Sequence, residues 1–188
     1  GSVARQAVNN RQLFITKMEL VPGGVDVYLS SIALGKSLAK ELADAFCAET
    51  KESPKLVGQT TDGQDMYRLT YLVRLPDYRV GDIVSFQGKY YRLSRLNGSG
   101  GKLTGLADFR DRPVRRADMP SVKLYERSGD LAEATVVSRS GMEIQVLDPS
   151  NYSTVDLKVP ADAEIGDAVR VVRIDDVLYY VPDSSAKR

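Results

Sequence analysis

The chain has 188 residues, of which 43% are hydrophobic and 27% charged, and its net charge is +1. These proportions exclude a disordered chain, and the length suits one large domain or two to three small ones. No apolar run approaches the roughly 18 residues that a membrane span needs and no secretory signal opens the sequence, so we expect a cytoplasmic protein without a membrane partner.

The first third of the sequence predicts a hairpin followed by a helix. Apolar residues alternate with polar ones along 13–21 and 25–29, on either side of a Pro-Gly-Gly turn. Phe14, Met18 and Leu20 share the predicted buried face of the first strand. Leucines at intervals of four, with Ala45 and Phe46, then predict an amphipathic helix. The leucines concerned are Leu34, Leu38 and Leu42.

A second hairpin follows this helix. Asp62-Gly63 is a strong tight-turn signal between strands at 56–61 and 66–75. After a residual segment at 1–12, residues 13–77 are therefore predicted to form a ββαββ module with the helix on one face of the sheet. The open face is expected to carry four side chains: Lys17, Tyr28, Arg68 and Arg74.

From residue 78 the helical period disappears. Short strands are indicated at 80–86, 90–93 and 103–109, and glycines crowd 97–101. This spacing predicts a small SH3-like barrel over 78–117, with the glycine segment as a flexible hairpin tip.

Residues 118–183 repeat the all-strand pattern and predict an OB-like barrel, followed by a tail at 184–188. A Gly-Asp pair followed by a Tyr-Tyr pair occurs in both barrels, within 81–91 and 166–180. Because the spacings differ, we interpret this recurrence as the same local way of beginning a strand in two barrels rather than as a true sequence repeat. The predicted fold class is α+β: a ββαββ module followed by two small β-barrels, SH3-like and then OB-like.

Residues that catalysis and metal binding commonly use are scarce. Histidine is absent and Cys47 is the single cysteine, which excludes an intrachain disulfide, a CxxC metal pair and the commonest general base. We interpret Cys47 as apolar packing. The glycines at 98, 100 and 101 lack the GKS or GKT continuation of a P-loop. We therefore predict a protein that is not an enzyme and has no cofactor, metal or small-molecule substrate.

Charge is distributed unevenly along the chain. Residues 78–117 carry a net charge of +6, residues 118–183 carry −7 and residues 12–77 carry −2. A compact basic zone is typical of a module that faces phosphate, although a chance imbalance of surface charge is the alternative. Four arginines lie within 110–116, where they repel one another without an anionic partner. The candidate RNA-binding residues are Arg110, Arg112, Arg115, Arg116, Arg92, Arg95 and Lys102, with Lys17, Arg68 and Arg74 on the first module. Tyr28, Tyr90 and Tyr91 could stack on bases or belong to the core.

Several short patterns resemble known families. Gly24-Val25-Asp26-Val27-Tyr28, Lys51-x-Ser53-x-x-Leu56 and Tyr67-x-x-Thr70-Tyr71-x-Val73-x-x-Pro76 resemble the central region of the large-subunit nuclear export adapters, which are named after nonsense-mediated decay. Residues 141–148 and 155–160 are similar to the OB half of the hypusine-bearing initiation factor five A. The export adapters carry such an SH3-plus-OB pair.

The resemblance implies binding to the intersubunit face of the large ribosomal subunit, with the barrel pair near the tRNA exit site and its mobile stalk. The family's CxxC zinc module is missing, which suggests a chain shortened at its amino end, and its carboxy-terminal transport signals are missing, which favours an archaeal member. The 97–102 loop lacks the lysine-histidine context of hypusine modification, so Lys102 is not assigned that role.

The leading hypothesis is a non-catalytic assembly, quality-control or export-adapter-like factor that contacts ribosomal RNA and ribosomal proteins. One alternative is a translation factor that acts on mature ribosomes. Another is a scaffold whose acidic OB module docks basic ribosomal proteins.

Overall fold

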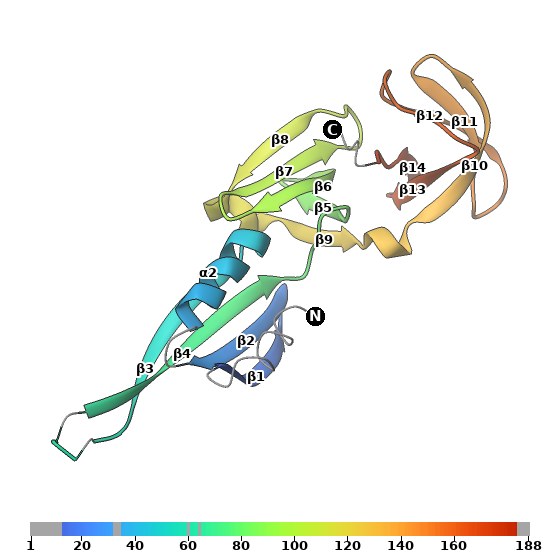
Figure 1. Ribbon diagram of the computed structural model, residues 1–188. Helices are drawn as coiled ribbons and strands as arrows, with labels where there is room; N and C mark the ends of the chain where they lie inside the picture. Colours follow the sequence, from blue (N-terminus) through green and yellow to red (C-terminus); the bar gives the residue numbers. More distant parts are fainter. Residues whose placement is uncertain (1–12, 32–34, 60, 64, 184–188) are drawn as a thin grey trace. The chain divides into compact units, whose positions relative to one another are not determined.

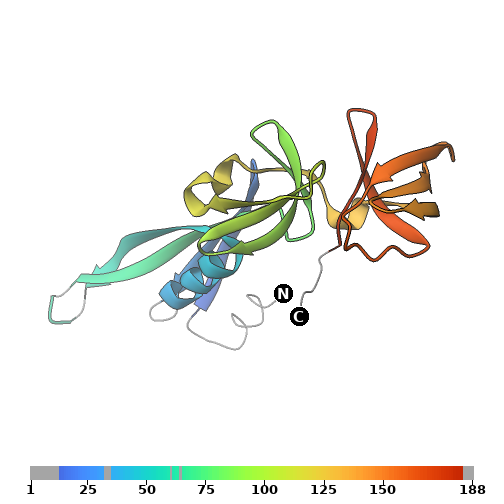
Figure 2. The same cartoon turned by 90° about the horizontal axis from the view of Figure 1, so that it is seen from above.

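The computed structural model describes residues 13–31, 35–59, 61–63 and 65–183. The chain forms two compact units, residues 1–77 with 96–100 and residues 78–95 with 101–188. Figures 1 and 2 show the elements of both units. The first unit holds β1 (Leu13–Val21), β2 (Gly24–Ser31), α2 (Gly35–Phe46), β3 (Glu49–Gln59) and β4 (Asp65–Pro76).

The first unit has the predicted strand–strand–helix–strand–strand order. Its four strands form an antiparallel sheet in the order β1-β2-β4-β3. The helix packs mainly on β4, with further contacts to β3 and β2. Val27 and Val73 face each other across β2 and β4 and are 4% and 0% exposed. Strand alternation therefore gives this sheet one apolar face, and the helix covers it.

The predicted buried face of β1 is wrong for the two residues that can be assessed. Met18 and Leu20 are 64% and 86% exposed. The reason is that β1 is an edge strand, beyond the strands on which α2 mainly packs. Ala45, predicted on the apolar helix face, is exposed, whereas Cys47 is buried as predicted. The side chains of Phe14, Leu34, Leu38 and Leu42 lie outside the described residues.

The first barrel-like sheet has five strands in the order β8-β7-β6-β5-β9. Val84, Leu93 and Leu103 are fully buried and form its interior. Gln87 and Gly88 both have positive φ angles, 49° and 76°, as a type I′ hairpin turn requires. The elements are β5 (Ile83–Phe86), β6 (Lys89–Asn97), β7 (Gly100–Gly105), β8 (Asp111–Arg115), the 3-10 helix η1 (Arg116–Ser121) and β9 (Lys123–Glu126). The edge strand β9 thus comes from residues beyond 117, where the sequence placed the end of this barrel.

The glycine segment forms a hairpin tip, as predicted, and this tip is short. Strand β6 runs to Asn97 and β7 begins at Gly100, so only two residues separate them. A Cβ atom on Gly101 would lie 3.1 Å from Met119 Sδ and 3.2 Å from the Arg95 carbonyl oxygen. Glycine is needed here because β7 packs closely on its neighbours.

The second barrel-like sheet has the order β12-β11-β10-β13-β14. Strand β10 pairs with β13 along its first half and with β11 along its second half, and its register shifts between Val136 and Ser138. Such a bulge bends a strand and lets the sheet curve around the buried Ile144, Val146 and Val171. After the 3-10 helix η2 (Ser128–Asp130), the strands are β10 (Ala132–Ser140), β11 (Glu143–Leu147), β12 (Thr154–Lys158), β13 (Ala168–Ile174) and β14 (Val177–Tyr180).

The two barrels share apolar contacts. Ile83 and Leu106 of the first barrel form one buried cluster with Val172, Ile174 and Val181 of the second. The α+β fold class with small barrel modules, predicted from the sequence, is confirmed, and the barrels form one unit because each completes the other's apolar surface.

Further contacts lie beside this cluster. The Phe109 ring lies edge-on to Tyr180, with centroids 6.2 Å apart. The buried carboxylate of Asp82 accepts hydrogen bonds from the Ser128 and Arg79 amides at 2.8 and 2.7 Å. Polar and aromatic contacts therefore hold the connecting segments in place.

Candidate nucleic-acid interface

The four arginines at 110–116 do not form one cluster. Strand β8 places alternate side chains on opposite faces, so Arg112 and Arg115 cannot point the same way. Arg115 is 86% exposed and pairs with Asp118 at 3.3 Å. The predicted repulsion among the arginines is thus relieved partly by alternation and partly by an acidic neighbour.

Arg112 lies over the aromatic interior of the first barrel. Its guanidinium carbon is 4.7 Å from the centroid of the Phe86 ring and 6.0 Å from that of Tyr91. It donates a hydrogen bond to the Tyr91 hydroxyl at 3.0 Å and another to the Gln87 side-chain oxygen. Both rings are buried, so this guanidinium packs against aromatic side chains of the barrel, and its donors are already partly used.

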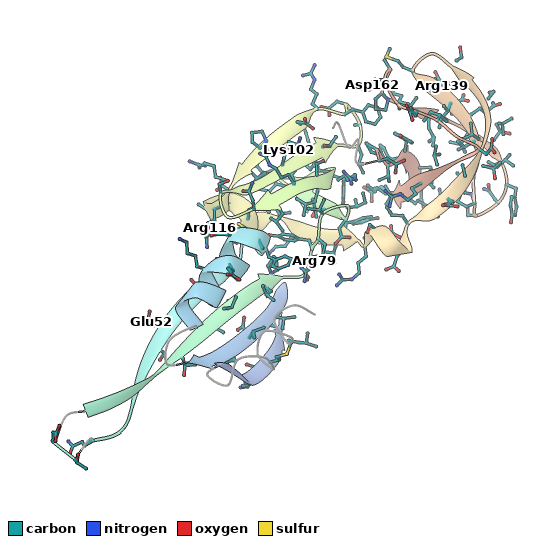
Figure 3. The ribbon with its side chains drawn as sticks, in the orientation of Figure 1. Glu52, Arg79, Lys102, Arg116, Arg139 and Asp162 are labelled. Carbon is teal, nitrogen blue, oxygen red and sulfur yellow. The ribbon has the colours of Figure 1, made fainter. Side chains whose placement is uncertain are left out.

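Five other basic residues of the first barrel are at least partly accessible to solvent. Arg110 is exposed just before β8, Arg116 is exposed at the start of η1, and Arg95 is exposed near the end of β6. Lys102 on β7 is 35% exposed and lies 3.6 Å from the Asp111 carboxylate. Figure 3 shows the positions of Lys102 and Arg116. We call these five residues the basic barrel surface: Arg95, Lys102, Arg110, Arg115 and Arg116.

Arg92 is a buried residue, 5% exposed, so we leave it out of the candidate interface. It lies opposite Ile83 on β5, and Ile83 belongs to the cluster shared by the barrels. Burial lowers the pKa of Arg92, and the neighbouring charge of Arg170 lowers it further. Its Nε atom is buried without a hydrogen-bond partner.

The predicted open face of the first unit carries balanced charge. Arg74 donates two hydrogen bonds, at 2.7 and 2.9 Å, to the buried carboxylate of Asp26, its cross-strand partner. These bonds lower the pKa of Asp26. Lys17 lies 3.5 Å from Glu19 and 5.5 Å from the centroid of the Tyr28 ring. The side chain of Arg68 lies outside the described residues. This face is therefore less suited to phosphate than the basic barrel surface.

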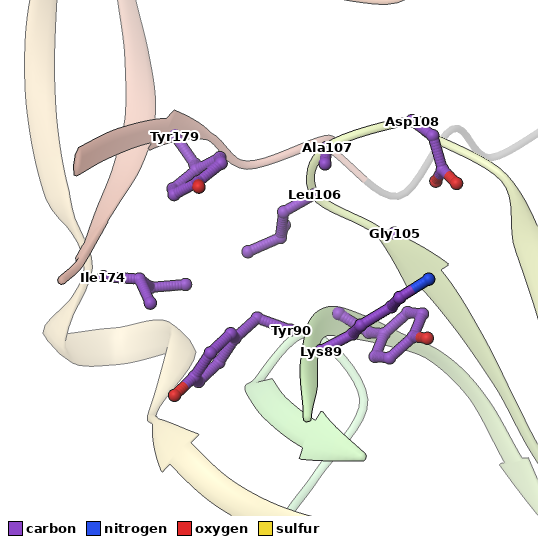
Figure 4. Close-up of a pocket in the computed structure, with 9 residues that line it drawn as sticks. Lys89, Tyr90, Gly105, Leu106, Ala107, Asp108, Ile174 and Tyr179 are labelled. Carbon is purple, nitrogen blue, oxygen red and sulfur yellow. The ribbon is translucent and has the colours of Figure 1, made fainter. Parts of the chain in front are cut away.

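A pocket of about 290 Å³ lies in the second unit between the barrels. In Figure 4 the side chains of Tyr90, Leu106, Ile174 and Tyr179 converge on it, and Lys89 lies at its margin. The sequence did not predict this pocket. The recurring Tyr-Tyr pair is the signal that could have found it, since the pocket takes the first tyrosine of each pair.

Within the described part of the chain, no group of three or more cysteine and acidic side chains gathers as a metal site would require. No described helix is long and apolar enough to cross a membrane.

Comparison with known protein families gives a match within the first unit. Residues 2–75 match the family model described as NMD3, second domain. No curated protein matches the chain. The matched residues include the segment in which the sequence resembles the export adapters. This match shows that residues 2–75 are similar to the second domain of NMD3.

Proposed function

We propose that this protein is a non-catalytic factor of ribosome biogenesis that binds the large ribosomal subunit, and that it contacts ribosomal RNA through the basic barrel surface. The similarity of residues 2–75 to the second domain of NMD3 supports the ribosomal setting, since the NMD3 family comprises export adapters of the large subunit. Such a factor acts in assembly or quality control.

The observation that carries the RNA contact is the exposure of cations on the first barrel. Arg95, Arg110, Arg115 and Arg116 are exposed on a module whose sequence has a net charge of +6. A guanidinium group can donate two hydrogen bonds to one phosphate, and an exposed guanidinium can do so without disrupting contacts inside the barrel. The acidic partner of Arg115 is itself on the surface, so phosphate can replace it at small cost.

The first unit has a different role in this proposal. Its polar sheet face pairs Arg74 with Asp26 and Lys17 with Glu19, so it is suited to hydrogen bonding and shape rather than to phosphate binding. We therefore expect it to orient the protein on the subunit, while the barrel supplies most of the electrostatic affinity.

Co-sedimentation with purified large subunits between low and moderate salt tests this proposal. The triple variant Arg110→Glu, Arg115→Glu, Arg116→Glu should weaken binding strongly. Each lost phosphate contact should lower the slope of log affinity against log salt by about 0.7 to 0.9. A matched control reverses three exposed lysines on other elements, Lys40→Glu, Lys51→Glu and Lys158→Glu, and so changes the net charge equally.

The control should retain most of the affinity and the full slope. Equal weakening by both triples would mean that net charge alone governs binding and would refute a specific barrel contact. Binding that ignores salt would favour the scaffold alternative, in which the acidic second barrel docks a basic ribosomal protein.

A further inference from the structure

We propose that the pocket between Tyr90 and Tyr179 receives one unstacked nucleobase of the bound RNA. This inference rests on the proposed function, because the base is delivered by a backbone held at the basic barrel surface. The aromatic lining of the pocket, the fixed position of the Tyr90 ring and the recurrence of the Tyr-Tyr pair support it independently.

The pocket has the size and lining of a site for a single planar group. Its volume, about 290 Å³, is at the lower end of the range for small-molecule sites, which is roughly 300 to 1,000 Å³. Tyr90 from β6 and Tyr179 from β14 supply ring faces and edges, and Leu106 and Ile174 supply an apolar floor (Figure 4). Tyrosine rings can stack on any of the four bases, because every base has a π-face.

One wall of the pocket is held in place before any ligand binds. The Tyr90 ring lies edge-on to Tyr125, with centroids 5.0 Å apart and planes at 72°. The Tyr125 hydroxyl in turn donates a hydrogen bond to the Arg173 carbonyl oxygen at 2.9 Å. A ring fixed in this way loses little conformational freedom on stacking, which favours binding.

The lining of the pocket includes one cation, Lys89, and one carboxylate, Asp108. Lys89 is exposed and lines the pocket, and the Arg110 amide donates a hydrogen bond to Asp108, another lining residue, at 3.0 Å. Tyr91, a third lining residue, is the ring over which Arg112 lies. A nucleobase that arrives attached to phosphate would meet the Lys89 ammonium group among the lining residues. Sequence-tolerant RNA binding commonly combines such cations with aromatic stacking platforms.

The two Tyr-Tyr pairs divide their rings in the same way. Tyr91 and Tyr180 are each 6% exposed and belong to the barrel interiors, whereas Tyr90 and Tyr179 remain partly exposed in the pocket. Because neighbouring strand residues point to opposite faces, each pair supplies one largely buried ring and one partly exposed pocket ring, although Tyr91 also contributes to the lining.

The test compares two single-stranded RNA octamers, one with a central 2-aminopurine and abasic sites at its other seven positions, and one that is abasic throughout. The full chain should bind the first about 5- to 100-fold more tightly, the range expected for one stacked base, and should change the 2-aminopurine fluorescence. Tyr179→Leu keeps apolar volume but removes the π-face, so it should reduce the preference to less than twofold. Tyr179→Phe should retain the preference.

Tyr152→Leu is the matched control, because Tyr152 is 77% exposed and does not line the pocket. It should behave as the wild type. The affinity of Tyr179→Leu for the abasic octamer and its salt slope should be unchanged, which verifies that the variant is folded.

Two outcomes would overturn the inference while leaving the proposed function intact. The first is equal binding of the two octamers by the wild type with a normal salt slope. The second is a shift of the Leu106 and Ile174 methyl resonances by N-acetyltyrosinamide but not by adenosine, which would assign the pocket to a protein side chain. If neither octamer binds and large subunits also fail to bind, the proposed function itself is refuted.

Discussion

Replacing Arg112 should destabilise the first barrel, although the sequence alone suggests a surface phosphate contact. The guanidinium lies 4.7 Å from the Phe86 ring centroid and donates a hydrogen bond to the Tyr91 hydroxyl at 3.0 Å. A cation–π contact of this kind contributes about 0.5 to 2 kcal/mol and a hydrogen bond from a charged donor about 1.5 to 3 kcal/mol. For Arg112→Ala we therefore expect a loss of about 2 to 5 kcal/mol in the free energy of unfolding. At about 2 to 4 °C for each kcal/mol, the melting temperature should fall by about 4 to 20 °C.

Arg115→Ala is the matched control, three residues away on the same strand. Its side chain is 86% exposed, and an exposed pair such as Arg115 with Asp118 contributes only about 0.2 to 0.5 kcal/mol. The melting temperature should fall by no more than about 2 °C, while the affinity for large subunits falls. Differential scanning calorimetry measures both variants.

Arg112→Lys separates charge from geometry. Lysine keeps the positive charge but lacks the planar fork that spans two rings and two acceptors, so most of the stabilisation should be lost. Arg112→Ala could instead have the same melting temperature as the wild type and lose RNA affinity as Arg115→Ala does. In that case Arg112 is a phosphate contact, and the reasoning from its ring contacts is refuted.

The other predictions concern stability. Arg92→Met should raise the melting temperature by a few degrees, because it removes a buried Nε atom that has no hydrogen-bond partner and keeps the apolar part of the side chain. A melting temperature below that of the wild type would contradict this and would mean that the guanidinium stabilises the contact between the barrels. Gly101→Ala should cost about 1 to 3 kcal/mol in denaturant unfolding, because its Cβ would press on Met119 and the Arg95 carbonyl, whereas Gly129→Ala meets nothing within 4 Å and should have little effect. Hydrogen bonds from Ser150 and Arg173 lower the pKa of Asp148 to about 2, so its contribution to stability is present above pH 4 and is lost as the pH falls towards 2. Asp148→Asn should therefore show a flatter stability profile than the wild type between pH 4 and pH 2, and parallel profiles would contradict this assignment.

The order of the elements could be predicted from local periodicity. Alternation along 13–21 and 66–75 indicates strands, and the turn signals at Asp62-Gly63, Gln87-Gly88 and Asp175-Asp176 indicate hairpins. These signals suffice because strand alternation and turn geometry depend on residues close together in the chain. At Asp175 and Asp176 both φ angles are positive, as the hairpin turn requires.

What covers each face was decided only by the tertiary structure. Met18 and Leu20 have the pattern of a buried face but lie on an edge strand, and Arg92 has the pattern of a surface cation but lies where the second barrel packs. Arg112 and Arg115 are the same residue type on the same strand, yet Arg112 lies over aromatic rings and Arg115 is exposed to solvent. Burial depends on elements that are distant in the sequence, and periodicity contains no information about which of them meet. The pairing of Tyr90 with Tyr179 across 89 positions of the chain is decided in the same way, by the contact between two barrels rather than by either strand.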